Sequence, residues 1–207
     1  MRPNQIDLMD GSLICGEARM SFAEVLEQRF GAAAGELIGT GTVGPEIIKD
    51  GLPVVWEVGM GAVELNVDHD TGAISVTDYL SVADVGKAIN PIQCEGQEEG
   101  AAMMGIGHAL FEEMVYEGGQ LINSTLVDYR IPSFSDMPRG FHTVLVENGD
   151  GLGPYGSRGM GEGGIFSVAP AITGALARAT GVEICDLPLT PERVWRSLRS
   201  INGKRDG

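Results

Sequence analysis

Cysteine and positive charge are both scarce in this chain of 207 residues. Its three cysteines, Cys15, Cys94 and Cys185, lie far apart and form no CxxC pair, so no zinc-ribbon or iron–sulfur pattern is present. Lys and Arg number 14 against 29 Asp and Glu, which gives a formal net charge of −15. Such a chain repels phosphate backbones and anionic lipid headgroups, so we expect neither nucleic acid nor a membrane as a partner.

Long apolar runs are missing as well. The longest one, Gly163 to Ala177, is interrupted by Pro170 and is shorter than the roughly 20 residues that span a bilayer. Residues 1–14 contain neither the apolar core of a signal peptide nor a twin arginine. We therefore expect a cytoplasmic protein whose cysteines are free thiols.

The histidines and serines show no catalytic or metal-binding pattern. His69, His108 and His142 have no consistent metal-ligand spacing, so we assign no metal ligand. Ser157 and Ser167 lack a G-x-S-x-G elbow and a nearby His/Asp arrangement, which argues against hydrolase chemistry.

Glycine, by contrast, is abundant, with 31 residues, about twice the usual share of ~7%. It follows no collagen-like period, so it indicates many tight turns and places where the backbone closely approaches another backbone or a ligand. Hydrophobic residues make up 43% and charged residues 21%, which excludes a disordered chain. We expect a single domain over residues 1–207.

The hydrophobic pattern predicts an α+β fold with a mixed, mostly antiparallel sheet and packed helices. Strands are predicted over Val54–Val67 and Ala73–Ala83, as a β-hairpin, and over Phe141–Glu147. A glycine-rich loop is expected over Asn148–Gly164. Helices are predicted over Ser21–Phe30, where Ser21 and Glu24 form a capping box, and over Glu95–Met114, Ser167–Thr180 and Pro191–Leu198.

The helix predicted over Glu95–Met114 contains three glycines, Gly100, Gly105 and Gly107. Each costs about 1 kcal/mol relative to Ala, so we expect another backbone to pack closely on that side. The same helix carries the acidic pairs Glu98-Glu99 and Glu112-Glu113. Because adjacent helical residues point apart, we expect these pairs to form solvated faces or to contact a basic partner rather than a metal.

A carboxylate stands among glycines in the loop before the third helix. Gly159-x-Gly161-x-x-Gly164 formally matches a dinucleotide fingerprint, but no strand runs into it and Glu162 would repel a pyrophosphate. A helix N-terminus favours the ionised form of Glu162, and the glycines leave room for a ligand. Glu162 is therefore a candidate general base, with simple helix capping as the alternative that these residues leave open.

A second candidate segment runs from Asn90-Pro91 to Gly96-Gln97. The amide of Gln97 offers a donor and an acceptor, which suits the mixed edge of a heterocycle. The alternative is an Asn-Pro turn followed by an ordinary polar first turn of a helix.

Taken together, six ordered segments resemble one known family. They are Val82–Pro91, Glu95–Gln97, Gly105–Glu113, Asp128–Pro132, Gly159–Glu162 and Leu187–Val194. In this order they are similar to the C-terminal part of the molybdopterin-binding subunit of the xanthine dehydrogenase and aldehyde oxidase family, the molybdenum hydroxylases. The resemblance covers residues 20–198 and implies the fold of the C-terminal molybdenum-binding domain of that family.

The resemblance also implies roles for individual residues. Glu162 matches the base that takes a proton from a hydroxyl group on molybdenum, whose oxygen then attacks an electron-poor carbon of the substrate while hydride passes to a sulfur ligand. Gln97 matches the residue that contacts the molybdenum-site ligands or the pterin. Main-chain groups of Met160, Gly161 and Gly163 would line the same site.

The implied activity is oxidative hydroxylation of an N-heterocycle or aldehyde-type substrate with water as the oxygen source. The implied cofactor is molybdenum–molybdopterin, in its cytosine dinucleotide form, with iron–sulfur clusters and FAD on other subunits. Because the family's subunit is several times longer, we expect activity only with a larger molybdopterin-binding chain, an iron–sulfur subunit and a possible FAD subunit. The alternatives are a non-catalytic assembly or scaffold protein and a stand-alone enzyme that uses Glu162 without molybdenum.

Overall fold

A computed structural model describes residues 5–32, 36, 38–41 and 56–205 of the chain. The chain divides into two compact units, Met1–Val54 and Val55–Gly207. The expectation of one cofactor-binding domain over residues 1–207 stays a prediction, because the internal packing of each unit does not test what binds the cofactor.

The first unit is a small antiparallel sheet followed by a helix. Strands β1 (Asp7–Met9), β2 (Ser12–Cys15) and β3 (Ala18–Ser21) pair in that order. Helix α1 (Phe22–Phe30) begins with the predicted capping box: Glu24 N–H donates to Ser21 Oγ (3.2 Å), and Ser21 N–H donates to the Glu24 carboxylate (2.7 Å). The capping box is thus confirmed, although none of the helix residues is buried in this structure.

The second unit contains a three-stranded mixed sheet in the order β4-β5-β8. The predicted hairpin is confirmed: β4 (Gly59–Val67) pairs antiparallel with β5 (Ile74–Asp84). Val54, at the start of the predicted first strand, lies outside the described residues. Strand β8 (Gly140–Val146) pairs parallel with β5, and Asp84 lies opposite Val146 at the end of both strands. The segments that follow β5 and β8 therefore start side by side.

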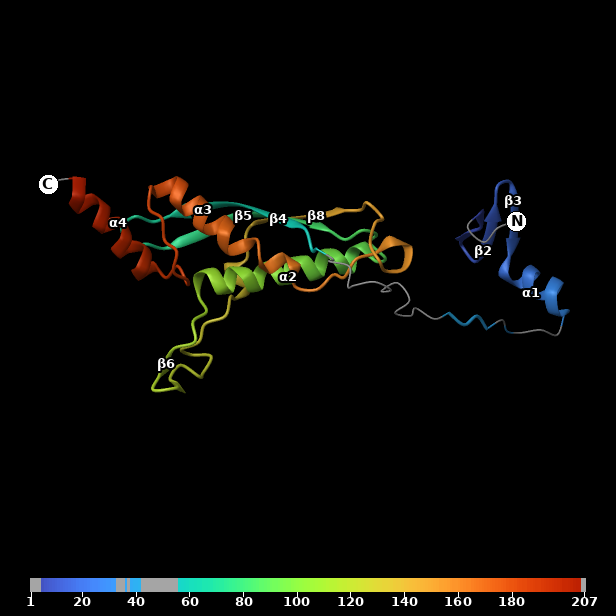
Figure 1. Cartoon of the computed structure of the whole chain (residues 1–207), viewed down its shortest axis with the longest axis horizontal. Coiled ribbons are helices and arrows are strands. Elements are labelled where there is room, and N and C mark those ends of the chain that lie inside the picture. Colours follow the sequence, from blue (N-terminus) through green and yellow to red (C-terminus); the bar gives the residue numbers. More distant parts are fainter. Residues whose placement is uncertain (1–4, 33–35, 37, 42–55, 206–207) are drawn as a thin grey trace, which may run out of the picture. The chain divides into compact units, whose positions relative to one another are not determined.

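Helices α2 (Pro91–Leu110) and α3 (Val168–Thr180) pack with this sheet around one hydrophobic core (Figure 1). A third helix, α4 (Pro191–Arg205), adds Val194 and Leu198 to the core and is longer than predicted. The largest fully buried apolar side chains of this core are Tyr79, Ile106, Ile172, Leu176 and Leu189. The predicted α+β class with a mixed, mostly antiparallel sheet is confirmed.

Helix α2 begins four residues earlier than the predicted Glu95, because the Asn-Pro pair caps it. Asn90 Oδ1 accepts a hydrogen bond from Gln93 N–H (3.2 Å), and Pro91 takes the first helical position. Asn90 and Pro91 are thus the cap and the first residue of α2 and not a separate turn. As a result, Gln97 lies in the second turn of the helix, and the role of Gln97 stays a prediction.

The expected close approach to the glycines of α2 is confirmed at Gly105. A Cβ added there would lie 2.5 Å from Val168 Cγ2 and 3.1 Å from the carbonyl oxygen of Ile165. At Gly107 the neighbours are side chains, those of Glu112 and Pro132, and at Gly100 the space is open. Of these three glycines, only Gly105 thus allows another backbone to approach α2.

The prediction for the acidic pair Glu98-Glu99 was wrong for Glu98. This residue is 2% exposed and points into the second unit, where Ser81 Oγ donates a hydrogen bond to its Oε1 (2.5 Å). Helix α2 is covered both by the sheet and by the loop before α3, so it has little solvated face at this position.

An arm rich in exposed apolar residues extends from the end of α2 (Figure 1). It contains the short strands β6 (Tyr116–Glu117) and β7 (Gln120–Leu121) and leads to the 3-10 turn η3 (Phe134–Asp136). We call residues 114–134 the apolar arm. Its exposed large apolar residues are Met114, Val115, Tyr116, Ile122, Leu126, Val127, Ile131 and Phe134. None of the helices in the described part of the chain is long and apolar enough to cross a membrane.

Candidate functional site

The candidate site lies where the segments leaving β5 and β8 meet the start of α2. Backbone hydrogen bonds tie these segments together: Gly149 N–H donates to Gly86 O (2.8 Å), and Arg158 N–H donates to Val85 O (2.9 Å). Gly86 has a φ of +63°, and a Cβ there would collide with the carbonyl oxygen of Gly156. A glycine is therefore required for the two segments to approach this closely.

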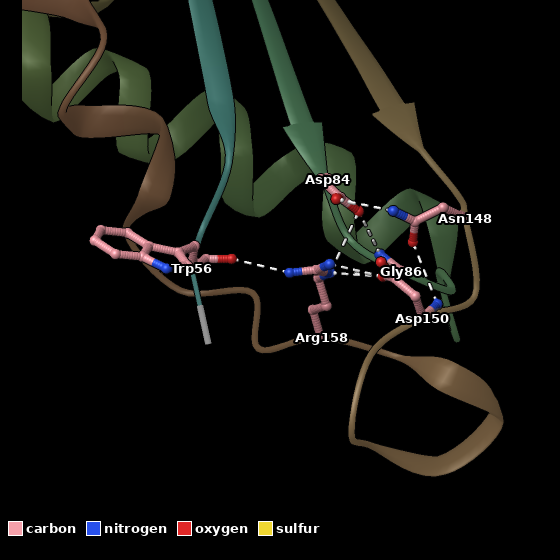
Figure 2. A network of polar contacts seen from close by, with 6 residues as sticks. All are labelled: Trp56, Asp84, Gly86, Asn148, Asp150 and Arg158. Carbon is pink, nitrogen blue, oxygen red and sulfur yellow. Dashed lines mark hydrogen bonds and ion pairs between the residues drawn. The ribbon is translucent and has the colours of Figure 1, made fainter. Parts of the chain in front are cut away.

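Arg158 is the centre of a polar network that fixes the loop (Figure 2). Its Nε and Nη2 both donate to Asp150 Oδ1 (3.2 and 2.7 Å), and its Nη1 donates to the carbonyl oxygen of Trp56 (2.9 Å). Asp84 Oδ1 lies 3.5 Å from Arg158 Nε, and Asp84 Oδ2 accepts from Asn148 Nδ2 (3.0 Å). One guanidinium thus joins the chain before β4, the end of β5 and the loop after β8.

This guanidinium keeps its charge. The hydrogen bond with Asp150 raises the pKa of Arg158 above its ordinary value, and the charges of Asp150 and Asp84 add to this effect. The side chains of Arg158 and Asp84 are 17% and 14% exposed, whereas that of Asp150 is 57% exposed, so only the pair with Asp84 is shielded from water. The network is therefore a fixed ionic anchor for the glycine-rich loop.

Gln97 reaches the same loop from α2. Its Nε2 donates a hydrogen bond to the carbonyl oxygen of Gly161 (2.9 Å). Two residues predicted for the site, Gln97 and Gly161, are thus in direct contact although they are far apart in the sequence. Gln97 is exposed.

Glu162 directly follows Gly161 in the loop and is exposed. It precedes the 3-10 turn η5 (Gly163–Ile165), which is closed by a hydrogen bond from Ile165 N–H to the Glu162 carbonyl (3.1 Å). Its side chain makes no capping hydrogen bond to this turn, and α3 starts only at Val168. The geometry therefore does not support helix capping as the role of the Glu162 carboxylate.

Gly163 and Met160 complete the predicted site. A Cβ on Gly163 would collide with the carboxylate of Glu57, so this second carboxylate lies against the loop beside Glu162. Met160 packs against a small apolar cluster formed by Ala83, Val85 and Ala88. The side chain of Met160 thus anchors the loop, while its neighbours face open space.

Two clefts flank the loop and share Arg158 and Met160 as lining residues. The first, of 620 Å³, is the helix cleft, and the second, of 450 Å³, is the Trp56 cleft. Residues lining the helix cleft are Val85, Lys87, Ile89, Asn90, Gln93, Cys94, Gly96, Gln97, Ser157, Arg158 and Met160. Residues lining the Trp56 cleft are Trp56, Glu57, Asp84, Arg158, Gly159, Met160 and Gly161.

Sequence reasoning missed four residues of this region: Glu57, Lys87, Glu98 and Arg158. Lys87 and Arg158 stand inside segments of the family resemblance or directly before one, which was the available signal. Glu57 precedes β4 in an unremarkable stretch, and only the folded chain brings it to Gly163. No local pattern could have identified it.

The chain matches the family model of the molybdopterin cofactor-binding domain over residues 1–138. This match includes Gln97 but ends before Glu162. The chain is 31% identical over 188 residues to the probable hypoxanthine oxidase of Escherichia coli (strain K12), covering 89% of this chain and 19% of that protein. It is 40% identical over 138 residues to the putative xanthine dehydrogenase molybdenum-binding subunit of the same organism, covering 66% of this chain and 18% of that protein.

Among solved structures, quinoline 2-oxidoreductase from Pseudomonas putida 86 superimposes with a TM-score of 0.71 at 32% identity. The superposition covers 95% of this chain and 26% of that one. The fold and the family match thus define a molybdopterin cofactor-binding domain. The chain belongs to the molybdenum hydroxylases, the family of xanthine dehydrogenases and aldehyde oxidoreductases, and it spans about a fifth of the length of the curated relatives it matches.

The residues of the helix cleft suit a molybdopterin cofactor. The side-chain amides of Gln93 and Gln97 supply donors and acceptors for a pterin edge. The two cations of the cleft are already paired with carboxylates, Lys87 with Glu147 and Arg158 with Asp150 and Asp84. The loop itself is open: a Cβ added at positions 159 or 161 would meet no atom within 4 Å. A bulky ligand can therefore approach the main chain there.

Proposed function

We propose that this chain is a component of a molybdenum hydroxylase that oxidatively hydroxylates an N-heterocycle or aldehyde-type substrate, with water as the oxygen source. The observation that carries the proposal is the exposed, uncapped Glu162 in a glycine loop that Gln97 and Arg158 fasten beside an open cleft. Relatives named for hypoxanthine and quinoline support a nitrogen heterocycle as the substrate class. We place this activity in the cytoplasm.

In this proposal Glu162 is the general base. Its carboxylate is free of intramolecular capping and lies next to the open main chain of Gly161, where a reacting group can reach it. Gln97 holds the Gly161 carbonyl and so fixes the direction of the loop. The main-chain groups of Met160, Gly161 and Gly163 line the reaction site around this carboxylate.

The cofactor would be molybdenum–molybdopterin, in the cytosine dinucleotide form, held in the helix cleft by the side-chain amides of Gln97 and Gln93. When bound, it supplies the two-electron chemistry that oxidises the substrate carbon. Electrons would leave through iron–sulfur clusters and FAD on other subunits.

We further propose that the chain is active only together with a larger molybdopterin-binding chain. The apolar arm supports this proposal, because Val127 and Phe134 are 86% and 91% exposed and such residues normally mark a contact surface. The helix cleft and the Trp56 cleft are both open, so a second chain is needed to enclose a cofactor and a substrate.

The test is Glu162→Gln in the assembled enzyme, with Glu64→Gln, an exposed residue of β4, as the control. Gln keeps the size of the side chain but cannot take up a proton. We expect turnover to fall by about 10²–10⁴-fold while molybdenum content stays at the wild-type level. Wild-type turnover in the Glu162→Gln enzyme would refute the assignment of the base, and loss of molybdenum would show a cofactor-holding role instead.

A further inference from the structure

Glu98 is a buried carboxyl with an unusual environment. Ser81, itself fully buried, donates a hydrogen bond to Oε1, whereas Oε2 is buried and has no hydrogen-bond partner in the structure. A buried oxygen without a partner lowers stability, and an apolar side chain of similar volume would avoid this effect. The core alone therefore does not account for a glutamate at this position.

The contact that Glu98 makes with the glycine loop offers a reason. A Cβ added to Gly164 would lie 2.9 Å from Glu98 Oε1 and 3.0 Å from Glu98 Cδ, so the carboxyl group directly covers the Cα of this glycine. Gly164 is buried in the middle of η5, the turn that begins right after Glu162. The carboxyl of Glu98 thus lies against the turn that carries the proposed base.

Gln97 and Glu98 hold the loop on both sides of Glu162. Gln97 binds the Gly161 carbonyl before it, and Glu98 contacts Gly164 after it. Two residues of the loop, Glu162 and Gly163, lie between these two contacts, which consecutive residues of α2 make. Gly163 lies against Glu57, so Glu162 is the residue of this pair that carries a side chain.

A second set of contacts, which involves Ser167, Tyr79 and Gly105, also holds the turn η5 in place. Ser167 Oγ lies 3.0 Å from the Tyr79 hydroxyl and 3.4 Å from the Gly164 carbonyl oxygen. Farther along α2, Gly105 allows the carbonyl of Ile165 to approach the helix. The turn therefore lies between α2 and β5, and Glu98 fills the space between Ser81 of β5 and Gly164.

We propose that Glu98 is a positioning residue that fixes the orientation of Glu162 through the contact with Gly164 and the hydrogen bond from Ser81. The inference rests on the proposed function of Glu162 as the base. A glycine-rich turn has many accessible backbone conformations, and a carboxylate displaced by about 1 Å loses much of its rate contribution. A rigid buried carboxyl packed on the turn restricts these conformations.

The first experiment measures amide hydrogen exchange in the full chain without cofactor. It compares Glu98→Ala, Gly164→Ala and Glu98→Gln with the Glu64→Gln control. We expect Glu98→Ala and Gly164→Ala to speed exchange of the Ile165 amide, which closes the turn onto Glu162, by about tenfold or more. Exchange in β4 and β5 should stay at the wild-type rate. Glu98→Gln keeps the size of the side chain and an oxygen that accepts from Ser81, so it should behave like wild type.

The second experiment uses the assembled enzyme. There, Glu98→Ala should lower kcat by about tenfold or more with molybdenum content and KM unchanged, and Glu98→Gln should restore most of it. If Glu98 only stabilised the fold, Glu98→Ala would instead speed hydrogen exchange throughout the second unit and lower the amount of enzyme that contains molybdenum.

The proposal is overturned if Gly164→Ala and Glu98→Ala leave the Ile165 amide unchanged, or if the turn loosens while kcat stays at the wild-type value. If Glu98→Ala does not fold, Gly164→Ala decides alone, because it disturbs the same contact without removing the carboxyl. The exchange result is independent of the base assignment, which fails only if Glu162→Gln retains turnover.

Discussion

The Tyr79 hydroxyl lies in the core of the second unit, 3.0 Å from Ser167 Oγ. Burial raises the pKa of Tyr79, the charge of Glu98 raises it further, and the bond with Ser167 lowers it in part. Because the folded pKa is above the ordinary value of 10, the contribution of this group to stability is complete below pH 10. It is lost as the pH rises through the folded pKa.

From this we predict that Tyr79→Phe lowers the free energy of unfolding by about 1 kcal/mol at neutral pH. It should also reduce the loss of stability above pH 10, since Phe has no proton to release. Urea unfolding at several pH values measures both effects, with Tyr155→Phe, an exposed residue, as the control. Equal alkaline destabilisation of wild type and Tyr79→Phe would contradict the pKa argument.

Arg158 allows a second test at the scale of single residues. Lysine has one compact ammonium group and cannot bind Asp150 twice and the Trp56 carbonyl at once. We expect Arg158→Lys to speed hydrogen exchange in the loop between Asn148 and Met160, with the core of the unit unaffected. Arg178→Lys, at an exposed position of α3, should leave the loop unchanged.

Single residues were predictable where side-chain chemistry stood out locally. Glu162 and Gln97 were identified because a carboxylate among glycines and an amide at a helix start are unusual, and the structure places both at one loop. Their roles stay predictions. Glu98 was misjudged because its burial depends on Gly164, which comes near only after α2 and η5 have packed.

At the scale of elements, the two α2 glycines Gly100 and Gly105 form a matched pair. Gly105→Ala would place a methyl group against Val168 and the Ile165 carbonyl, and such overpacking costs about 1–3 kcal/mol. Gly100→Ala meets no atom within 4 Å and should stabilise the helix by up to about 1 kcal/mol. Thermal unfolding of the two variants should therefore shift in opposite directions, and shifts of the same sign would show that packing does not decide between them.

Helix α1 supplies a prediction on pH. The hydrogen bond from the Ser21 backbone lowers the pKa of Glu24 below 4.5, and the Ser21 hydroxyl lowers it further. The ionised form is thus favoured in the folded state, so the stabilisation is present above pH 4.5 and is lost as the pH falls through the lowered pKa. A carboxyl titration by NMR should show the pKa of Glu24 rise part of the way to its ordinary value in Ser21→Ala, because this change removes the hydroxyl bond and keeps the larger backbone bond.

The α-helices and the strands β4, β5 and β8 could be predicted, whereas the short strands β1, β2, β3, β6 and β7 and the ends of several elements could not. Periodicity and caps indicated the hairpin of β4 and β5 and the four α-helices of the described residues, since these signals are local. The start of α2 was misplaced by four residues because an Asn-Pro pair fits a turn as well as the cap and first position of a helix. The parallel pairing of β5 and β8 was not predicted, because it joins strands separated by a whole helix and the apolar arm.

For the whole molecule, a net charge of −15 and an exposed apolar arm have opposite effects on association. Electrostatic repulsion between the negatively charged copies keeps them apart at low salt. Added salt weakens this repulsion, because the Debye length falls from about 10 Å at 0.1 M to about 3 Å at 1 M. We predict that the isolated chain self-associates as salt is raised, measured by sedimentation velocity. Val127→Ser should reduce this association, and Ile38→Ser, at an exposed position outside the arm, should not.

The contacts that secure the loop also link it to the folding of the rest of the unit. The hydrogen bonds Gln97–Gly161, Asp84–Asn148 and Arg158–Trp56 join residues 64, 64 and 102 positions apart in the sequence. Bonds of such long range form only when the intervening sheet and helix are in place. Any local opening of α2 or of the end of β5 must therefore release the loop, and a partner that binds only the ordered loop selects chains whose second unit is completely folded.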